Sequence, residues 1–168
     1  FFLTEDSVEI SNLVYGSKQP VPDRVEFGEI RYCAHSDEDC LVHRITNTDS
    51  ENKVMACVDV EILRTPPVIA ADPMVDEHHV LTKTMSNCRV YKLALQPNEE
   101  ISVSYPFFYL SLVLKGGTIQ TTVGTGNDGF SWETTHQVGD VDWNSPSIGK
   151  SIRNTGTTVF ETYIVEWC

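Results

Sequence analysis

Aromatic residues at every second position are the first feature of this sequence that could do chemistry. Val103, Tyr105, Phe107 and Tyr109 share one face if the chain is extended there, because successive side chains of a strand point to opposite faces. Two phenols on an apolar face can hold a planar molecule, and each can donate or accept a proton. The pattern predicts a small-molecule pocket. The structural alternative is that these side chains simply fill the interior of a small barrel.

The stretch that carries these residues has the pattern of β-strands. Residues 91–122 (YKLALQPNEEISVSYPFFYLSLVLKGGTIQTT) alternate apolar and polar side chains on both sides of a turn at Gln96–Glu99, and a second turn follows at Gly116–Gly117. A period of two between Pro, Asn and Gly is typical of strands. Residues 1–61 read as short strands between polar turns and show no helical period, so the predicted fold class is all-β.

Residues 91–122 and 139–154 (GDVDWNSPSIGKSIRN) are similar to the first and second motifs of the cupin superfamily. The resemblance implies a double-stranded β-helix, or jelly-roll barrel, that is complete over residues 77–168. Cupin enzymes hold a divalent metal with two histidines spaced HxH, a glutamate four residues later and a histidine from the second motif. Imidazole and carboxylate donors on a rigid barrel suit such metals and leave positions open for substrate.

The resemblance places these four ligand positions at Val103, Tyr105, Tyr109 and Lys150. Valine has no donor atom, and a protonated lysine repels a cation. We therefore expect no metal and no other cofactor in this unit. Lys150 and Trp143 would join the inward face from the facing strand, while leucines 110, 112 and 114 would point outward. The predicted ligand-binding set is Val103, Tyr105, Phe107, Tyr109, Trp143 and Lys150.

A weak internal repeat relates the two ends of the chain. Three pairs of segments match: 1–10 with 112–121, 28–32 with 139–143, and 43–48 with 150–155. On this basis residues 1–63 are predicted to be the C-terminal half of a second cupin-like barrel. Residues 64–76, which contain three prolines, are the predicted linker.

The histidines offer weaker metal candidates. His43 takes the second-motif histidine position of the first unit, so it is an alternative metal ligand whose companions would have to precede Phe1. His78 and His79 are adjacent on an expected strand and point to opposite faces, so they cannot chelate one ion together.

Charge and cysteine content limit the partners and the compartment. A net charge of −12 disfavours nucleic acid and direct membrane binding. Cys33 and Cys40 flank an acidic loop and could form a disulfide in an oxidising compartment, organellar or extracytoplasmic. The five cysteines include no CxxC pair, which argues against a structural zinc site. No run of eighteen apolar residues and no targeting segment is visible in the sequence, so the compartment stays open.

These features favour a non-catalytic, metal-free cupin that acts as a structural or binding module, as an accessory subunit of a larger protein assembly. The expected partners are other protein chains or copies of itself, because a half-barrel leaves open strand edges. A small planar or anionic molecule is the expected ligand. The alternative is a cupin isomerase, epimerase or lyase that uses Lys150, Tyr105 and Tyr109 as acid–base groups. A ligand-sensing cupin would use the same pocket without turnover.

Overall fold

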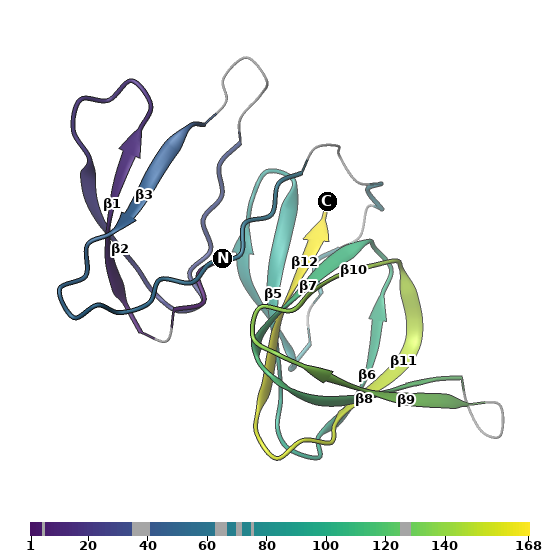
Figure 1. The fold of residues 1–168 in the computed structure, drawn as a ribbon. Coiled ribbons are helices and arrows are strands. Elements are labelled where there is room, and N and C mark those ends of the chain that lie inside the picture. Colours follow the sequence, from purple (N-terminus) through teal and green to yellow (C-terminus); the bar gives the residue numbers. More distant parts are fainter. Residues whose placement is uncertain (5, 35–40, 63–66, 70–71, 75, 125–128) are drawn as a thin grey trace. The chain divides into compact units, whose positions relative to one another are not determined.

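The structure is a computed structural model that describes residues 1–4, 6–34, 41–62, 67–69, 72–74, 76–124 and 129–168. All regular elements in these ranges are β-strands, which confirms the predicted all-β class. Within the same ranges, no helix is long and apolar enough to cross a membrane. The chain forms two compact units, Phe1–Glu61 and Ile62–Cys168 (Figure 1).

The N-terminal unit is built on one small antiparallel sheet. Its strands are β1 (Val8–Val14), β2 (Val21–Val25) and β3 (His43–Asn47), in the order β2-β1-β3. One apolar cluster of this unit consists of buried Phe2, Val8, Ile10 and Val25 with half-buried Ile45 and Met55.

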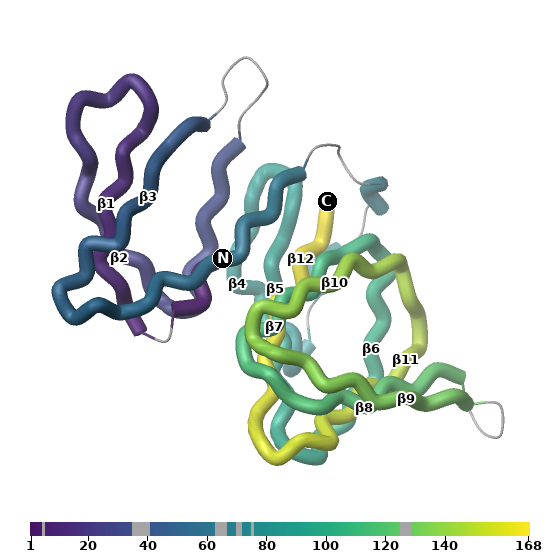
Figure 2. The backbone as a smooth tube through the Cα atoms, in the orientation of Figure 1, coloured from purple at the N-terminus to yellow at the C-terminus, as the bar shows by residue number. Residues whose placement is uncertain are grey.

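The described residues of the C-terminal unit form nine strands in two antiparallel sheets. Figures 1 and 2 show the course of the chain through them. The strands are β4 (His79–Thr84), β5 (Cys88–Leu95), β6 (Glu100–Tyr105), β7 (Tyr109–Lys115), β8 (Gly117–Val123), β9 (Phe130–His136), β10 (Val141–Asn144), β11 (Ser147–Asn154) and β12 (Phe160–Trp167). One sheet has the order β10-β7-β12-β5-β4 and the other β6-β11-β8-β9. Strands β5 to β12 in this order form an eight-stranded jelly roll, so the expected double-stranded β-helix is confirmed.

The interior of this barrel is filled by alternate side chains from both sheets. Twelve buried residues form its core: Tyr91, Leu93, Leu95, Ile101, Val103, Tyr105, Phe107, Tyr109, Val113, Ile119, Phe160 and Ile164. The turn predicted at Gln96–Glu99 joins β5 to β6, and it contains Asn98 with a positive φ of 65°. Asparagine tolerates this left-handed conformation better than most side chains, which suits a tight strand connection.

Candidate functional site

Tyr105, Tyr109 and Lys150 lie together inside the C-terminal barrel. Lys150 on β11 is directly opposite Val103 on β6, so the two side chains share the interior face. Lys150 Nζ donates a hydrogen bond of 2.9 Å to the Tyr109 hydroxyl and lies 5.3 Å from the centre of the Tyr105 ring. The rings of Tyr105 and Tyr109 have their centres 4.6 Å apart, and Phe107 packs against both. The structure therefore brings five of the six predicted ligand-binding residues into one buried cluster.

Burial shifts the proton affinities of this cluster toward the uncharged forms. It raises the pKa of Tyr109 to about 12 and raises the pKa of Tyr105 well above its ordinary value. It also lowers the pKa of Lys150, because the ammonium loses much of its hydration. A lysine with a lowered pKa beside a protonated phenol can accept a proton while the phenol donates one.

Replacing Lys150 with methionine is expected to alter the stability of the protein at alkaline pH. Because the pKa of Lys150 is lower in the folded state, the unfolded chain binds more protons in the window between the folded-state pKa and 10.5. The free energy of unfolding of the wild-type protein therefore gains, from this group, up to about 1.4 kcal/mol per pH unit as the pH rises through that window. Lys150→Met removes this contribution. Urea denaturation at a series of pH values measures the free energy of unfolding of both proteins. If that free energy depends on pH in the same way in both, Lys150 is fully hydrated and the prediction is wrong.

A hydrogen-bonded series of three side chains, Asp76, His79 and Tyr105, adjoins the cluster. It was not predicted from the sequence. The His79 Nε2 atom lies 2.8 Å from the Tyr105 hydroxyl, and its Nδ1 atom lies 2.8 Å from an oxygen of Asp76. In the tautomer that carries its hydrogen on Nδ1, the ring donates a hydrogen bond to the carboxylate and accepts one from the Tyr105 hydroxyl at Nε2. Burial acts to raise the pKa of Asp76, but hydrogen bonds from the ring and backbone of His79 and the backbone of His78 outweigh it and lower the pKa.

Sequence reasoning missed this series because Asp76 fell in the predicted linker. The alternation rule correctly separated the two histidines: His79 is buried beside Tyr105, whereas His78 lies near Glu77 and Glu99. The available signal was an aspartate three residues before a histidine at the start of a strand. There the Asp76 carboxylate accepts hydrogen bonds from the backbone N–H groups of both histidines and also holds the His79 ring.

A second buried polar group lies on the interior face, at the end of β12. Glu166 is completely buried, and one of its oxygens accepts a 2.8 Å hydrogen bond from the Tyr91 hydroxyl. The Arg89 guanidinium lies 3.4 Å from both carboxylate oxygens. Tyr91 in turn accepts the backbone N–H of Met74 at 3.2 Å, so part of the predicted linker packs on the barrel. Burial raises the pKa of Glu166, and its bonds with Tyr91 and Arg89 offset only part of that effect.

Glu166→Gln is expected to flatten the acid-side pH dependence of stability. Because its pKa is raised in the folded state, Glu166 of the folded protein keeps its proton at pH values just above 4.5. At the same pH, Glu166 of the unfolded chain has released its proton. Its contribution to the free energy of unfolding therefore falls as the pH rises from 4.5 through the folded-state pKa. The glutamine variant lacks this decline, which denaturation curves between about pH 4 and 8 measure. A decline of the same size in both proteins would contradict the raised pKa.

Trp143 does not share the interior face, so its predicted position was wrong. In the pairing of β10 with β7, Trp143 lies opposite Leu110, whereas Asn144 lies opposite Tyr109. Directly opposed side chains of an antiparallel pair point to the same face. Trp143 is therefore on the outer face, where it is 51% exposed and stacks on Phe108. The parity argument failed because the register between β10 and β7 cannot be counted along the sequence of β10.

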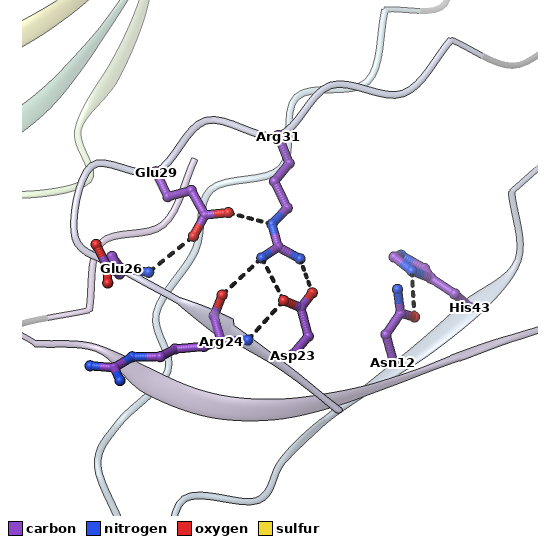
Figure 3. Close-up of polar contacts among 7 residues, drawn as sticks. All are labelled: Asn12, Asp23, Arg24, Glu26, Glu29, Arg31 and His43. Atoms are coloured by element: carbon purple, nitrogen blue, oxygen red, sulfur yellow. Dashed lines mark hydrogen bonds and ion pairs between the residues drawn. The ribbon is translucent and has the colours of Figure 1, made fainter. Parts of the chain in front are cut away.

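The remaining candidates lie in the N-terminal unit. His43 is exposed on β3, and its Nδ1 atom lies 3.1 Å from the side-chain oxygen of Asn12 (Figure 3). Its role as a metal ligand stays a prediction. Among the residues that the structure describes, no three His, Cys, Asp or Glu side chains are arranged to hold a metal ion. The predicted Cys33–Cys40 disulfide lies outside the described residues, because Cys40 does.

Comparison with known proteins finds similarity only among solved structures. No protein family and no curated protein matches the sequence. A cupin domain from Bordetella pertussis is 14% identical over 57% of this chain and 99% of its own, with a TM-score of 0.46. An RmlC-like cupin with a double-stranded β-helix fold from Methanocaldococcus jannaschii is 10% identical over 64% and 93%, with a TM-score of 0.42. A DMSP lyase from Ruegeria pomeroyi is 14% identical over 49% and 39%, with a TM-score of 0.37.

The strand order itself identifies the fold of the C-terminal unit. Its two sheets hold β10, β7, β12 and β5 on one side of the core and β6, β11, β8 and β9 on the other. An edge strand, β4, extends the first sheet and delivers His79 to the interior. This arrangement gives the C-terminal unit a double-stranded β-helix fold.

Proposed function

We propose that the C-terminal unit is a metal-free cupin that binds or supports other molecules without catalysing a reaction, as an accessory subunit of a larger assembly. One observation carries the proposal. The ammonium of Lys150 occupies the position of a metal-ligating histidine and donates a 2.9 Å hydrogen bond to Tyr109, which occupies the position of the glutamate. A cation at this point would meet a positive charge on one side and a protonated phenol on the other.

The packing of the cluster supports the same proposal. Tyr105 and Phe107 are 2% and 1% exposed, so the space that a substrate would need is filled by side chains. The hydroxyl groups of Tyr105 and Tyr109 already have protein partners in His79 and Lys150. A hydrogen-bonded, close-packed interior rigidifies a barrel, and it leaves the outer surfaces of the molecule for recognition.

Metal binding of two proteins tests the proposal directly. The wild-type chain is compared with a fourfold variant that carries the cupin ligand set: Val103→His, Tyr105→His, Tyr109→Glu and Lys150→His. Calorimetric titration with Mn²⁺, Ni²⁺ and Zn²⁺ should show stoichiometric binding to the variant only, with the strongest binding for Ni²⁺ or Zn²⁺. The proposal would be overturned if the wild-type chain bound one metal ion tightly and the Tyr109→Phe variant did not.

An acid–base enzyme is the second candidate, and the lowered pKa of Lys150 favours it. In this case Lys150 would take a proton from a small substrate, and Tyr105 or Tyr109 would return one, as in an isomerase, epimerase or lyase. A planar or anionic molecule suits the aromatic rings and the cation.

Chemical labelling of the lysines discriminates between the two candidates. A reactive lysine is labelled at neutral pH by pyridoxal phosphate and borohydride faster than ordinary lysines. If the interior is closed and structural, Lys150 should be labelled more slowly than exposed Lys115, which serves as the internal reference. Preferential labelling of Lys150, lost on addition of an anionic competitor, would favour the enzyme.

A further inference from the structure

The hairpin of β8 and β9 has one polar face and one apolar face. On the polar face, the Thr122 hydroxyl lies 2.7 Å from the Ser131 hydroxyl. The other face carries Phe130 and Trp132 on β9, and Val123 on β8 shares it because Val123 pairs with Phe130. We call these three apolar side chains the β8–β9 patch.

The patch lies on the side of the sheet that faces the barrel core. By alternation, His136 is on the same face of β9, and its ring packs against Phe160 of the core with 5.7 Å between the ring centres. The patch is nevertheless open to solvent: Phe130 is 65% exposed, Trp132 40% and Val123 39%. Single exposed apolar side chains are common, but neighbouring ones on the core side of a sheet indicate a binding surface.

A row of paired residues connects the patch to Lys150. Phe130 pairs with Val123, Val123 pairs with Lys150, and Lys150 pairs with Val103. Directly opposed side chains share a face, so this row lies on the core side of all four strands. Exposure increases along the row, from buried Val103 through half-buried Lys150 to Phe130. Because neighbouring strands are about 4.8 Å apart, the backbones of Lys150 and Phe130 are about 10 Å apart.

The patch and Lys150 together suit a planar ring that carries a carboxylate. The rings of Phe130 and Trp132 are nearly parallel, at 27°, with centres 5.6 Å apart, so they offer a surface on which another ring can stack. The Lys150 ammonium has three N–H donors, of which Tyr109 accepts one. A carboxylate can accept another, and a hydrogen bond between charged groups is stronger than one between neutral groups. Asp142, which shares the core-side face of β10, disfavours a second negative charge.

The size of the patch favours a small molecule over a protein partner. A stable protein interface buries about 800 Å² on each partner. The patch consists of only three partly exposed side chains, and the opposite face of the hairpin is polar. A single stacked ring system covers such an area.

The N-terminal sheet provides an internal comparison, because its strands β2, β1 and β3 have the order of β9, β8 and β11. Ile10 pairs with Asn47 as Ile119 pairs with Asn154. This register differs by two residues from the alignment predicted from the sequence, since Ile10 is equivalent to Ile119 and not to Thr121.

The positions that form the patch and its cation are occupied differently in the N-terminal sheet. Counted from the equivalent pairs, Val21 takes the place of Trp132, and His43 takes the place of Lys150. The N-terminal sheet therefore lacks the tryptophan and the lysine, and it serves as a reference that should not respond to a ligand of the patch.

We propose that the β8–β9 patch binds a planar aromatic molecule with one carboxylate group, and that Lys150 binds the carboxylate. The ligand lies outside the packed interior, so it needs no space between Tyr105 and Phe107. The inference goes beyond the proposed function, because it depends neither on the absence of a metal nor on the absence of catalysis. Its failure would leave the proposed function unchanged.

Binding of 2-naphthoate to the full chain tests this site, because the probe has two fused rings and one carboxylate. Calorimetric titration should show saturable binding of one probe per chain. Backbone hydrogen exchange, followed by mass spectrometry, should slow in β8 and β9 and stay unchanged in β1 and β2. The amide 2-naphthamide keeps the rings without the charge, and acetate keeps the charge without the rings. Each should bind more weakly than 2-naphthoate by about tenfold or more.

Matched variants of the full chain locate the site. Trp132→Ala and Lys150→Met should each weaken the binding of 2-naphthoate by about tenfold or more. Trp143→Ala is the control: it removes a tryptophan of similar exposure, 51%, from the outer face of the other sheet, and it should leave the affinity unchanged. If Lys150→Met does not fold, the comparison with 2-naphthamide still tests the charge. No saturable binding, equal affinity for 2-naphthamide, or the same affinity in wild type and Trp132→Ala would overturn the proposal.

Discussion

Replacing Tyr105 with alanine is expected to lower the free energy of unfolding of the C-terminal unit by about 3–5 kcal/mol, the range for removing a large buried aromatic side chain. The ring is 2% exposed and touches the rings of Phe107, Tyr109 and His79, so its removal leaves a cavity in the centre of the barrel. It also removes the partner of His79 Nε2. All three tryptophans of the sequence lie at position 132 or beyond, so their fluorescence during urea denaturation reports on this unit.

Tyr105→Phe is the matched control, because it removes only the hydroxyl group. The variant keeps the packing but leaves His79 Nε2 without its hydrogen bond, which should cost about 1–3 kcal/mol. Asp76→Asn combined with Tyr105→Phe should cost less than the sum of the two single changes, since all three side chains belong to one hydrogen-bonded series. A loss below about 1 kcal/mol for Tyr105→Ala would mean that the barrel interior is not packed as described.

The second large effect is expected at Asn154, a polar residue with no exposed surface. Its side-chain amide donates to the carbonyls of Leu95 and Thr158 at 3.0 and 2.8 Å, and its oxygen accepts the N–H of Gly156 at 3.0 Å. Asn154→Ala leaves the buried carbonyl of Leu95 without this partner and removes two half-buried hydrogen bonds, to Thr158 and Gly156. Because the buried group costs about 1–3 kcal/mol and each of the other bonds about 0.5–1.5 kcal/mol, the free energy of unfolding should fall by about 2 kcal/mol or more. Tryptophan fluorescence under denaturant is again the measurement.

Asn47→Ala is the matched control, because the Asn47 side chain makes equivalent hydrogen bonds in the N-terminal sheet, to the carbonyl of Lys53 and the N–H of Asp49. Asn47 is exposed, so water can replace the lost partners, and the expected cost is about 0.5–1 kcal/mol. Hydrogen exchange of β1 and β3 measures it. Equal costs at the two positions would show that burial does not set the strength of this motif.

Strand alternation and turn residues were sufficient to predict the all-β class, whereas the barrel was predicted from the resemblance to cupins. The Gly116–Gly117 turn fixed the register of β7, and the cupin resemblance then placed Tyr105, Tyr109 and Lys150 at positions that the structure brings into contact. For Tyr105 and Tyr109 this succeeded because positions on strands joined by a short connection can be counted along the sequence. Lys150 lies on the distant strand β11, and only the second motif of the resemblance placed it.

The features that were missed depend on contacts between distant segments. Trp143 was placed on the wrong face because the pairing of β10 with β7 joins strands far apart in sequence. Asp76 was read as linker, since only the approach of β4 to β6 shows that it holds His79 against Tyr105. The repeat was aligned two residues out in β1 because Val8 and Ile10 are both apolar and match Ile119 equally well by type.

The central position of β12 has a consequence for how the barrel is made. This strand is the last of the described strands along the chain, yet it lies between β5 and β7, and all eight of its residues are buried. During synthesis on a ribosome, β5 can pair with β4 and β7 with β10, but the two halves of the sheet cannot join until residues 160–167 have emerged. The nascent C-terminal unit therefore carries two apolar strands with one open edge each until the end of β12 is made, and it should depend on chaperones more than its size suggests.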